Sequence, residues 1–261
     1  MPEGAFPSPA SANGVGGGSA RSREQALLEI EDLHAYYGAS HVVQGISLSV
    51  AKGEAVALMG RNGVGKSTTL KSIIGLEART QGKIAFDGAD LTGLPPHARA
   101  ARGLGYVPEE RAVFPQMSVE ENIRIGALLH RASAARECLT TAYDLFPILA
   151  ERRLQLAGTL SGGQQKMLAL ARALALKPRL LLVDEPTEGL MPANVELITH
   201  AIADAARSGV AVLLVDASFD LVMGTCSRLY AMDHGVLTGM LRPGELSGPD
   251  ELAARYLGVE A

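Results

Sequence analysis

The stretch from Gly60 to Thr68 constrains this chain more than any other feature, because it follows the pattern G-x-x-x-x-G-K-S. Residues 54–59, just before it, read as a buried strand, and residues 66–76, just after it, carry apolar side chains at helical spacing. A strand, a glycine-rich loop and a helix in this order form the setting in which such a loop binds phosphate. We therefore predict a phosphate site here in preference to an ordinary glycine-rich turn.

The residue types of this loop indicate what it binds. Glycines let the backbone approach a ligand closely, and the N–H groups at the start of the helix favour an anion. Lys66 can then reach the β- and γ-phosphates of ATP, the Ser67 hydroxyl can ligate Mg²⁺, and Thr68 can contact the α-phosphate. The predicted nucleotide-binding residues of the loop are Gly60, Asn62, Gly63, Gly65, Lys66, Ser67 and Thr68.

A second candidate site follows the apolar run 180–183, which ends in Asp184 and Glu185. A continuously apolar strand is typical of a parallel sheet covered on both faces, and such sheets bind ligands at the carboxyl ends of their strands. We predict that Asp184 holds Mg²⁺ through water and that Glu185 orients or deprotonates an attacking water. Glu185 and Lys66 are thus the predicted catalytic residues; the competing interpretation is two solvated acids in a turn.

Two further segments leave alternatives open. In the run Leu160 to Gln165, with sequence L-S-G-G-Q-Q, Ser161 is a good N-cap, and the two glycines after it offer N–H groups to an anion. An ordinary capped helix explains this run equally well. Tyr37, next to Gly38, is placed either to stack on a nucleotide base or to cover the edge of a strand.

Composition excludes several classes of protein. The net charge is −4, which does not favour a general nucleic-acid surface. The two cysteines, Cys138 and Cys226, lie far apart among apolar or small residues, and we expect free thiols in a reducing compartment. No apolar run is long enough to span a membrane, and residues 1–20 have no apolar segment typical of a signal peptide.

The loop at 60–68 and the run L-S-G-G-Q, about twenty residues before Asp184, together resemble the ATP-binding cassette (ABC) ATPases. The likeness covers almost all of residues 27–240. It implies a head-to-tail dimer with two ATP molecules, each held between one subunit's phosphate-binding loop and the L-S-G-G-Q run of the other. In this family the base stacks on an aromatic residue, here Tyr37. The residues implied to contact the partner's ATP are Ser161, Gly162, Gly163 and Gln164.

The resemblance also implies the architecture. We expect an α/β fold with a P-loop NTPase (RecA-like) core, an antiparallel β subdomain and an inserted helical subdomain. Residues 1–24, rich in Gly, Ser and Pro, are expected to form a flexible tail. The ATP-binding core with its β subdomain is assigned to residues 25–89 and 158–261, and residues 90–157 to a loop and a helical signalling subdomain.

Within the family, the chain resembles the ATPase subunits of branched-chain amino acid importers and of the related urea and amide importers. This implies a second ABC subunit, identical or different, integral membrane permeases and, indirectly, a substrate-binding protein as partners. It also implies a peripheral place at the cytoplasmic face of the membrane, and no nucleic acid. The residues that carry this resemblance are Tyr36 to Gly38, Gly105 to Glu109, Phe114 and Pro115, Ser118 to Asn122, and Glu185 to Pro192.

The sequence departs from the family pattern at three positions. Glu109 stands where most cassettes have a glutamine, and by resemblance it ligates Mg²⁺ or binds the attacking water. Met191 stands where an aspartate is common. Ala217 takes the place of the switch histidine that contacts the γ-phosphate, and Asp216 beside it would repel phosphate, whereas Ser218 could substitute if the loop shifts. We therefore predict slow or partner-dependent hydrolysis.

Two other functions compete with that of an importer ATPase. The chain could be a degenerate cassette that binds ATP while a partner hydrolyses it, which Ala217 favours and an intact Glu185 disfavours. It could instead resemble the soluble cassettes of DNA repair or translation. Those proteins usually carry zinc insertions, long coiled coils or two cassettes in one chain, and this sequence shows none of these and no basic stripe.

Overall fold

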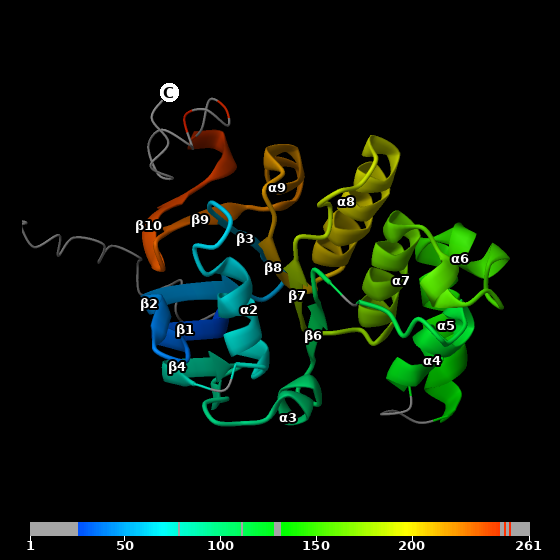
Figure 1. Ribbon diagram of the computed structural model, residues 1–261, viewed down its shortest axis with the longest axis horizontal. Coiled ribbons are helices and arrows are strands. Elements are labelled where there is room, and N and C mark those ends of the chain that lie inside the picture. Colours follow the sequence, from blue (N-terminus) through cyan, green and yellow to red (C-terminus); the bar gives the residue numbers. More distant parts are fainter. Residues whose placement is uncertain are drawn as a thin grey trace, which may run out of the picture.

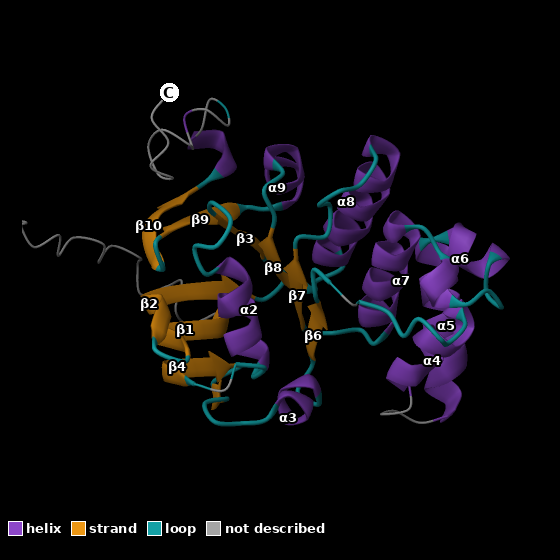
Figure 2. Ribbon diagram, in the orientation of Figure 1, coloured by secondary structure: helices purple, strands orange, loops and turns teal. Residues whose placement is uncertain are grey.

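The computed structural model describes residues 26–77, 79–110, 112–127, 132–245, 248 and 251, and it contains two sheets and a group of helices (Figures 1 and 2). The predicted tail, 1–24, lies outside the described residues. The predicted α/β fold, with an antiparallel sheet beside a largely parallel one and helices inserted between strands, is confirmed. No helix in the described part of the chain is both apolar and long enough to cross a bilayer.

The larger sheet has six strands, of which all but one neighbouring pair run parallel. Its strands, in spatial order, are β10 (Val236–Leu241), β9 (Arg228–Asp233), β3 (Ala55–Met59), β8 (Ala211–Val215), β7 (Leu180–Asp184) and β6 (Leu104–Val107). The residues of β3, β7 and β8 are buried throughout, as expected for strands covered on both faces.

Alternate residues of these central strands enter two different cores. Ala57, Leu181 and Leu214 pack among the helices on one face of the sheet. Val56 and Leu182 point to the other face, where they pack against α2 (Lys66–Ile74) and the smaller sheet. Because successive side chains of a strand point to opposite faces, a continuous apolar run is what this position requires.

The smaller sheet lies beside α2 in Figure 1 and is antiparallel, with strand order β2-β1-β4-β5. Its strands are β1 (Ala26–Tyr37), β2 (Ser40–Ala51), β4 (Thr80–Phe86) and β5 (Ala89–Asp90). The sequence suggested separate strands near residues 42–43 and 46–50, but β2 is continuous. It continues because Gly45, at φ 77°, is left unpaired between the pairs Leu33–Ile46 and His34–Gln44, and so forms a bulge.

Helices α4 (Val119–Ala127), α5 (Ala132–Leu145) and α6 (Pro147–Glu151) lie between β6 and β7 along the chain; α4 and α5 pack against α7 (Gly162–Ala175), and α6 packs against α5. A capping box begins α4: Ser118 N–H donates to Glu121 Oε2 at 2.7 Å, and Glu121 N–H donates to Ser118 Oγ at 3.2 Å. The 3₁₀ turn η1 (Ala157–Thr159) precedes α7, and α8 (Pro192–Arg207) follows β7.

Three short elements complete the fold: α3 (Pro96–Ala100), α9 (Phe219–Thr225) and the 3₁₀ turn η2 (Pro243–Glu245). Strand β6 falls inside the unit assigned to residues 90–157, yet it pairs with β7 in the larger sheet. The division of the chain into units remains a prediction.

The position of α2 depends on one buried arginine. Arg99, on α3, is 3% exposed and donates through Nη1 to the carbonyls of Ser72 and Ile73 at 2.8 and 2.7 Å. Its Nε donates to the Leu94 carbonyl at 2.8 Å. The last carbonyls of a helix have no partner in the following turn of the helix. The Ser72 carbonyl also accepts from the Gly75 N–H at 3.2 Å, so Arg99 matters most for the buried Ile73 carbonyl.

We expect Arg99→Met to lower the free energy of unfolding by about 2–4 kcal/mol, because it removes three charge-assisted hydrogen bonds and leaves the buried Ile73 carbonyl without its donor. Urea unfolding followed by circular dichroism measures this loss. Arg102→Met is the matched control, because Arg102 is exposed and donates only to the Ala98 carbonyl. Equal stabilities of the two variants would contradict the role given to Arg99.

Candidate functional site

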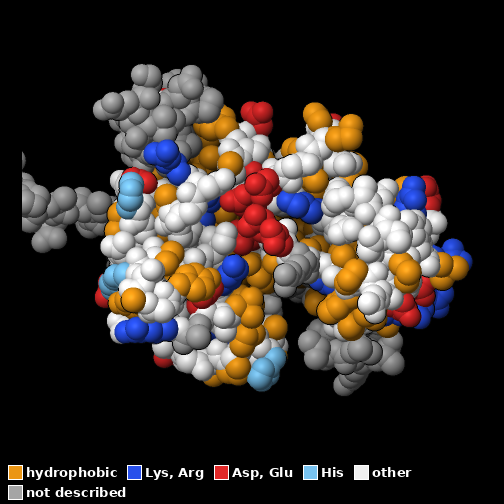
Figure 3. All heavy atoms as spheres, viewed as in Figure 1, with side chains coloured by type: hydrophobic (Ala, Val, Ile, Leu, Met, Phe, Trp, Pro, Cys, Tyr) orange, Lys and Arg blue, Asp and Glu red, His pale blue; other side chains and the backbone are white. Residues whose placement is uncertain are grey.

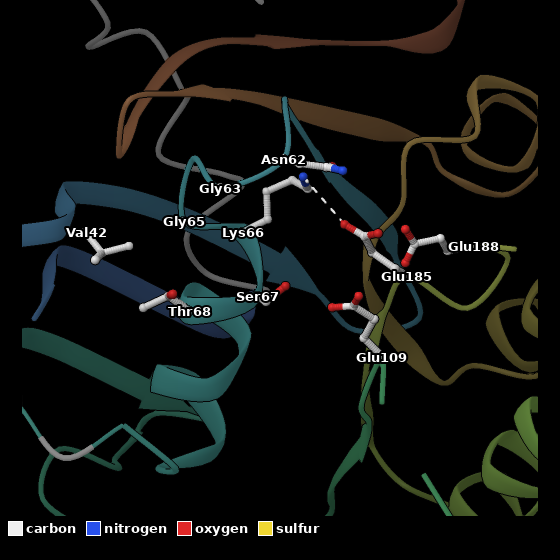
Figure 4. Close-up of a pocket in the computed structure, with 10 residues that line it drawn as sticks. All are labelled: Val42, Asn62, Gly63, Gly65, Lys66, Ser67, Thr68, Glu109, Glu185 and Glu188. Carbon is white, nitrogen blue, oxygen red and sulfur yellow. Dashed lines mark ion pairs between the residues drawn. The ribbon is translucent and has the colours of Figure 1, made fainter. Parts of the chain in front are cut away.

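A cavity of about 290 Å³ opens where the carboxyl ends of β3 and β7 meet the start of α2 (Figure 4). Acidic side chains gather at the centre of the face seen in Figure 3. The residues that line the cavity are Val42, Asn62, Gly63, Gly65, Lys66, Ser67, Thr68, Glu109, Glu185 and Glu188. The structure thus brings most of the predicted phosphate-binding residues together with two of the predicted carboxylates.

The glycine-rich loop has the backbone that its sequence predicts. Gly65 precedes α2 as its N-cap with φ 112°, a conformation that L side chains rarely adopt. A Cβ atom on Gly60 would lie 2.3 Å from the backbone carbonyl oxygen of Met232, so this position tolerates no side chain. Lys66 is 4% exposed, and its ammonium donates to the carbonyls of Gly60 and Arg61 at 2.9 and 3.0 Å.

Asp184 lies next to the loop, as predicted from the end of its strand. The Ser67 hydroxyl donates to Asp184 Oδ1 at 2.9 Å, and the Tyr106 hydroxyl donates to Oδ2 at 3.3 Å. Burial raises the pKa of Asp184, and the hydrogen bonds from Ser67 and Tyr106 oppose that rise. The hydroxyl and carboxylate oxygens are hard donors of the kind that Mg²⁺ prefers, so this pair fits a magnesium ion.

Three carboxylates face one another across the cavity from Ser67 (Figure 4). One oxygen from each of Glu109, Glu185 and Glu188, hereafter the acidic cluster, lies within 4.8 Å of the others. Lys66 Nζ lies 3.6 Å from Glu185 Oε1 and forms an ion pair with it. Burial raises the pKa of Glu185 despite this lysine, and burial together with a hydrogen bond to Glu188 raises the pKa of Glu109.

The backbone of Glu185 is held in an uncommon conformation. Its φ is 43°, a left-handed value that costs a non-glycine residue energy. Its N–H donates to the Val215 carbonyl at 2.7 Å, and its own carbonyl accepts from Lys166 Nζ of α7 at 2.6 Å. The same ammonium donates to the Glu188 carbonyl at 3.1 Å, so two contacts from α7 hold this turn.

The segment after β8, Asp216 to Ser218, was expected to lie beside the phosphate site, but none of its residues lines the cavity. Asp216 does not face the cavity. Its carboxylate accepts from Thr187 N–H and Oγ1 at 3.1 and 2.7 Å and from Ser218 N–H at 2.7 Å. The Ser218 hydroxyl, proposed as a substitute for the missing switch residue, accepts from Leu221 N–H at 3.3 Å and caps α9. Ala217 is exposed and does not line the cavity.

The L-S-G-G-Q run lies apart from the cavity of its own chain, because none of its residues lines that cavity. Ser161 caps α7 in a capping box with Gln164, accepting from Gln164 N–H at 3.3 Å. A Cβ atom added at Gly162 would have no neighbouring atom within 4 Å, and the residue has no left-handed φ. The chain's own fold therefore does not require glycine there. In contrast, a Cβ on the buried Gly163 would lie 2.4 Å from Asn194 Nδ2.

Tyr37 lies outside the residues that line the cavity. It is 48% exposed, and its hydroxyl donates to a Glu77 carboxylate oxygen. Burial, followed by the neighbouring Glu77 carboxylate, raises the pKa of Tyr37. An exposed ring face leaves room for stacking, so base stacking by Tyr37 stays a prediction.

Sequence reasoning missed two residues of this site. Glu188 completes the acidic cluster, and its signal was a second carboxylate three residues after Glu185, in a turn that begins with Pro186. Lys166 binds only backbone carbonyls, which leave no pattern in the sequence. Its place one helical turn after Ser161 was the one available hint.

A parallel sheet, a glycine-rich loop at the start of a helix, and an aspartate at the end of a neighbouring strand define a P-loop nucleotide-binding protein. A model of the family described as ABC transporter matches residues 43–188, over half of the chain. The chain belongs to the ABC transporter family and is the ATP-binding subunit of a transporter. The predicted ATPase activity agrees with this membership, whereas the roles of single residues remain predictions.

Two relatives with different transport roles are similar to the chain. The high-affinity branched-chain amino acid transport ATP-binding protein BraG of Pseudomonas aeruginosa is 38% identical over 209 residues, covering 80% of this chain and 90% of the relative. The lipopolysaccharide export system ATP-binding protein LptB of Escherichia coli is 34% identical over 237 residues, covering 90% and 98%. The relatives therefore include a protein of branched-chain amino acid transport and one of lipopolysaccharide export.

Solved structures agree on the fold. An ATP-binding subunit of an ABC transporter matches with a TM-score of 0.73 and 28% identity, covering 88% of this chain and 93% of that one. An ATP-binding cassette of an ABC transporter in its ADP conformation matches with a TM-score of 0.73 and 26% identity, covering 86% and 96%.

The raised pKa of Glu109 predicts a pH-dependent gain in stability for Glu109→Gln. Below the ordinary pKa of 4.5 the carboxyl is protonated in both states and adds nothing. Above it the unfolded chain ionises first, so wild-type stability falls as the pH rises through the raised folded value. We expect the melting temperature of Glu109→Gln to exceed that of the wild type by about 1–3 °C at pH 8, with no difference at pH 4.

Glu121→Gln controls for the sign of this effect. The Ser118 N–H holds the pKa of Glu121 below its ordinary range, so that variant gains nothing from higher pH and loses stability instead. Scanning calorimetry across this pH range in the absence of nucleotide measures both variants. A gain for Glu109→Gln that did not change with pH would contradict the ionisation argument.

Proposed function

We propose that this chain binds and hydrolyses ATP for an importer of branched-chain amino acids or of a related small amide such as urea. The observation that carries the ATPase part is one cavity lined by a phosphate-binding loop and a buried Glu185, with Asp184 hydrogen-bonded to the lining residue Ser67. The similarity to BraG supports import of amino acids, and the similarity to LptB keeps export as the second candidate.

Different residues in and beside the cavity bind the phosphates of ATP and the Mg²⁺ ion. The glycine-rich loop and the Asn62, Gly63 and Gly65 N–H groups bind the phosphates, and Lys66 exchanges its two carbonyl partners for phosphate oxygens. Ser67, Asp184 and Glu109 hold Mg²⁺. When bound, this ion offsets negative charge on the β- and γ-phosphates. Thr68 contacts the α-phosphate, and Gly60 lets the loop pass close to β9.

Glu185 acts as the general base. Its carboxylate takes a proton from a water molecule, whose oxygen attacks the γ-phosphorus, and the bond from that phosphorus to the bridging oxygen breaks. ADP leaves with the electron pair, and inorganic phosphate forms. The raised pKa of Glu185 makes it a stronger base than an ordinary carboxylate, and the Lys66 ion pair keeps it ionised.

A second subunit completes each site. None of the residues at the start of α7, Ser161, Gly162, Gly163 and Gln164, lines the cavity of its own chain, and the open space at Gly162 suits a ligand supplied by another chain. We assign these N–H groups and the Ser161 hydroxyl to the γ-phosphate of the partner's ATP, and Tyr37 to stacking on the base.

The other partners are membrane permeases and, through them, a substrate-binding protein, which place the chain at the cytoplasmic face of the membrane. Phe114, 45% exposed at the edge of the helical group, offers an apolar contact to a permease. Affinity purification from membranes followed by mass spectrometry tests this assignment. Recovery of permeases encoded with an amino acid or amide binding protein supports import, and recovery of lipopolysaccharide exporter components supports the second candidate.

The mechanism predicts a slow wild-type ATPase, because no side chain at Ala217 contacts the γ-phosphate. With Mg²⁺, we expect Glu185→Gln to lower the rate about 10²–10⁴-fold and Ala217→His to raise it about 10²-fold. Phosphate release measures all three proteins. Fast turnover of the isolated wild-type dimer would contradict the role of Ala217. An isolated Glu185→Gln protein as fast as wild type would reject Glu185 as the base, whereas an equal rate seen only in a mixture with a second ABC subunit would indicate that this partner hydrolyses the ATP.

A helical glycine outside the cavity tests the assembly. We expect Gly162→Ala to raise the melting temperature slightly, because alanine favours a helix, yet to lower ATP turnover at least about 10-fold by filling the space for the partner's nucleotide. Gly224→Ala in α9 is the matched control, since it also has open space and lies outside the site. Unchanged turnover in Gly162→Ala would argue against the shared site.

A further inference from the structure

Lys166 links the start of α7 to the turn that carries Glu185. Its ammonium donates to the carbonyls of Glu185 and Glu188 at 2.6 and 3.1 Å, so it bridges the two ends of one four-residue turn. Lys166 follows Ser161 by little more than one helical turn, and Ser161 begins the surface assigned above to the partner's ATP. One side chain thus connects the binding surface for one nucleotide with the predicted base for the other.

The turn needs such a contact because its backbone is not in a relaxed conformation. Glu185 has φ 43°, and a non-glycine residue stays there only where its surroundings hold it. Other contacts to the turn come from the end of β8 and the residue after it: Glu185 N–H donates to the Val215 carbonyl, and Thr187 donates to the Asp216 carboxylate. Lys166 supplies its contacts from a different element, α7.

Lys166 does not act by charge on the Glu185 carboxylate. The cation near that carboxylate is Lys66, at 3.6 Å, whereas Lys166 binds the main-chain oxygen of the same residue. Its effect is therefore on where the carboxylate points. A displacement of about 1 Å of a reacting group can cost about 10²-fold in rate, so two hydrogen bonds to this turn are enough to matter.

We propose that Lys166 is a positioning residue for Glu185, and that it couples the start of α7, where the partner's nucleotide binds, to the catalytic turn of its own chain. This inference rests on the proposed role of Glu185 as general base. It adds a residue that holds the base in place and a physical connection between the two ATP sites of the dimer.

The test compares Lys166→Met, which keeps the length of the side chain and removes its donors, with Lys166→Arg, which keeps donors. Single-turnover hydrolysis by the full chain with Mg²⁺ gives the rate and the half-saturating ATP concentration. We expect Lys166→Met to lower the rate about 10–100-fold, to change half-saturation less than about threefold, and Lys166→Arg to recover most of the loss. Lys177→Met is the control, since the Lys177 side chain is exposed and forms an ion pair with Glu137, away from the turn that carries Glu185.

A double-mutant cycle separates positioning from a general loss of structure. If Lys166 acts through Glu185, then Lys166→Met in a Glu185→Gln background causes little further loss, because the group it positions has already lost its function. Full additivity of the two losses overturns the proposal. So does a Lys166→Met protein whose rate equals wild type, or one in which only half-saturation changes.

Two further outcomes must be considered: a Lys166→Met protein that does not fold, and a Glu185→Gln protein that stays active. Should Lys166→Met fail to fold, as judged by its melting temperature, Lys166→Gln and Lys166→Arg carry the test, and equal wild-type rates in both overturn the proposal. A Glu185→Gln protein as active as wild type rejects the proposed function of Glu185 itself. That outcome is read from the single variant, so it is distinguishable from a failure of the inference about Lys166.

Discussion

Parallel pairing of β3 with β8 and of β8 with β7 brings the carboxyl ends of these strands to one edge of the larger sheet. The glycine-rich loop leaves β3 at this edge, and Asp184 ends β7 there. The hydrogen bond between Ser67 and Asp184 joins residues 117 positions apart in the chain. All later features of the site, from the cavity to the turn after β7, depend on this alignment of strand ends.

The site concentrates negative charge at some cost to the empty fold. The acidic cluster and Asp184 share one cavity region with a single buried lysine, and burial raises the pKa of Glu109, Glu185 and Asp184 together. Carboxylates in this arrangement prefer a cation among them. The proposed roles of these carboxylates, holding Mg²⁺ and taking a proton from water, require their ionised forms. Because their pKa values are raised, ionising them without a bound cation lowers the stability of the fold.

Features specified by short stretches of sequence were predictable. The loop from Gly60 to Thr68, the apolar central strands and the capping boxes at Ser118 and Ser161 each depend on neighbours within a few residues. Asp184 was predictable because strand ends of a parallel sheet meet at one edge. The partner surface proposed at Gly162 rests on the resemblance, because contacts with a second chain cannot be derived from the fold of one chain.

Other features depend on contacts that leave no mark on the local sequence. Asp216 was expected to face phosphate, yet its carboxylate is taken by Thr187 and Ser218, which only the packed loops bring near. Lys166 donates to main-chain carbonyls, which every residue has, so the sequence could not identify its partners. The bulge at Gly45 merged two expected strands into one because a single unpaired residue interrupts the alternation without ending the strand.

The register of β7 against β8 has a chemical meaning beyond stability. Asp184 pairs with Val215, and the next residue, Glu185, leaves the strand with a left-handed φ. The two adjacent carboxylates therefore have different partners, Ser67 for Asp184 and Lys66 for Glu185. A slip of one residue along β8 would exchange their places and turn every side chain of β7 to the opposite face. Such a chain could keep its secondary structure content although the Asp184 and Glu185 side chains had exchanged positions. The strand register is therefore needed for the proposed activity as well as for stability. A chain with the wrong register would keep its circular dichroism spectrum and lose its ATPase activity.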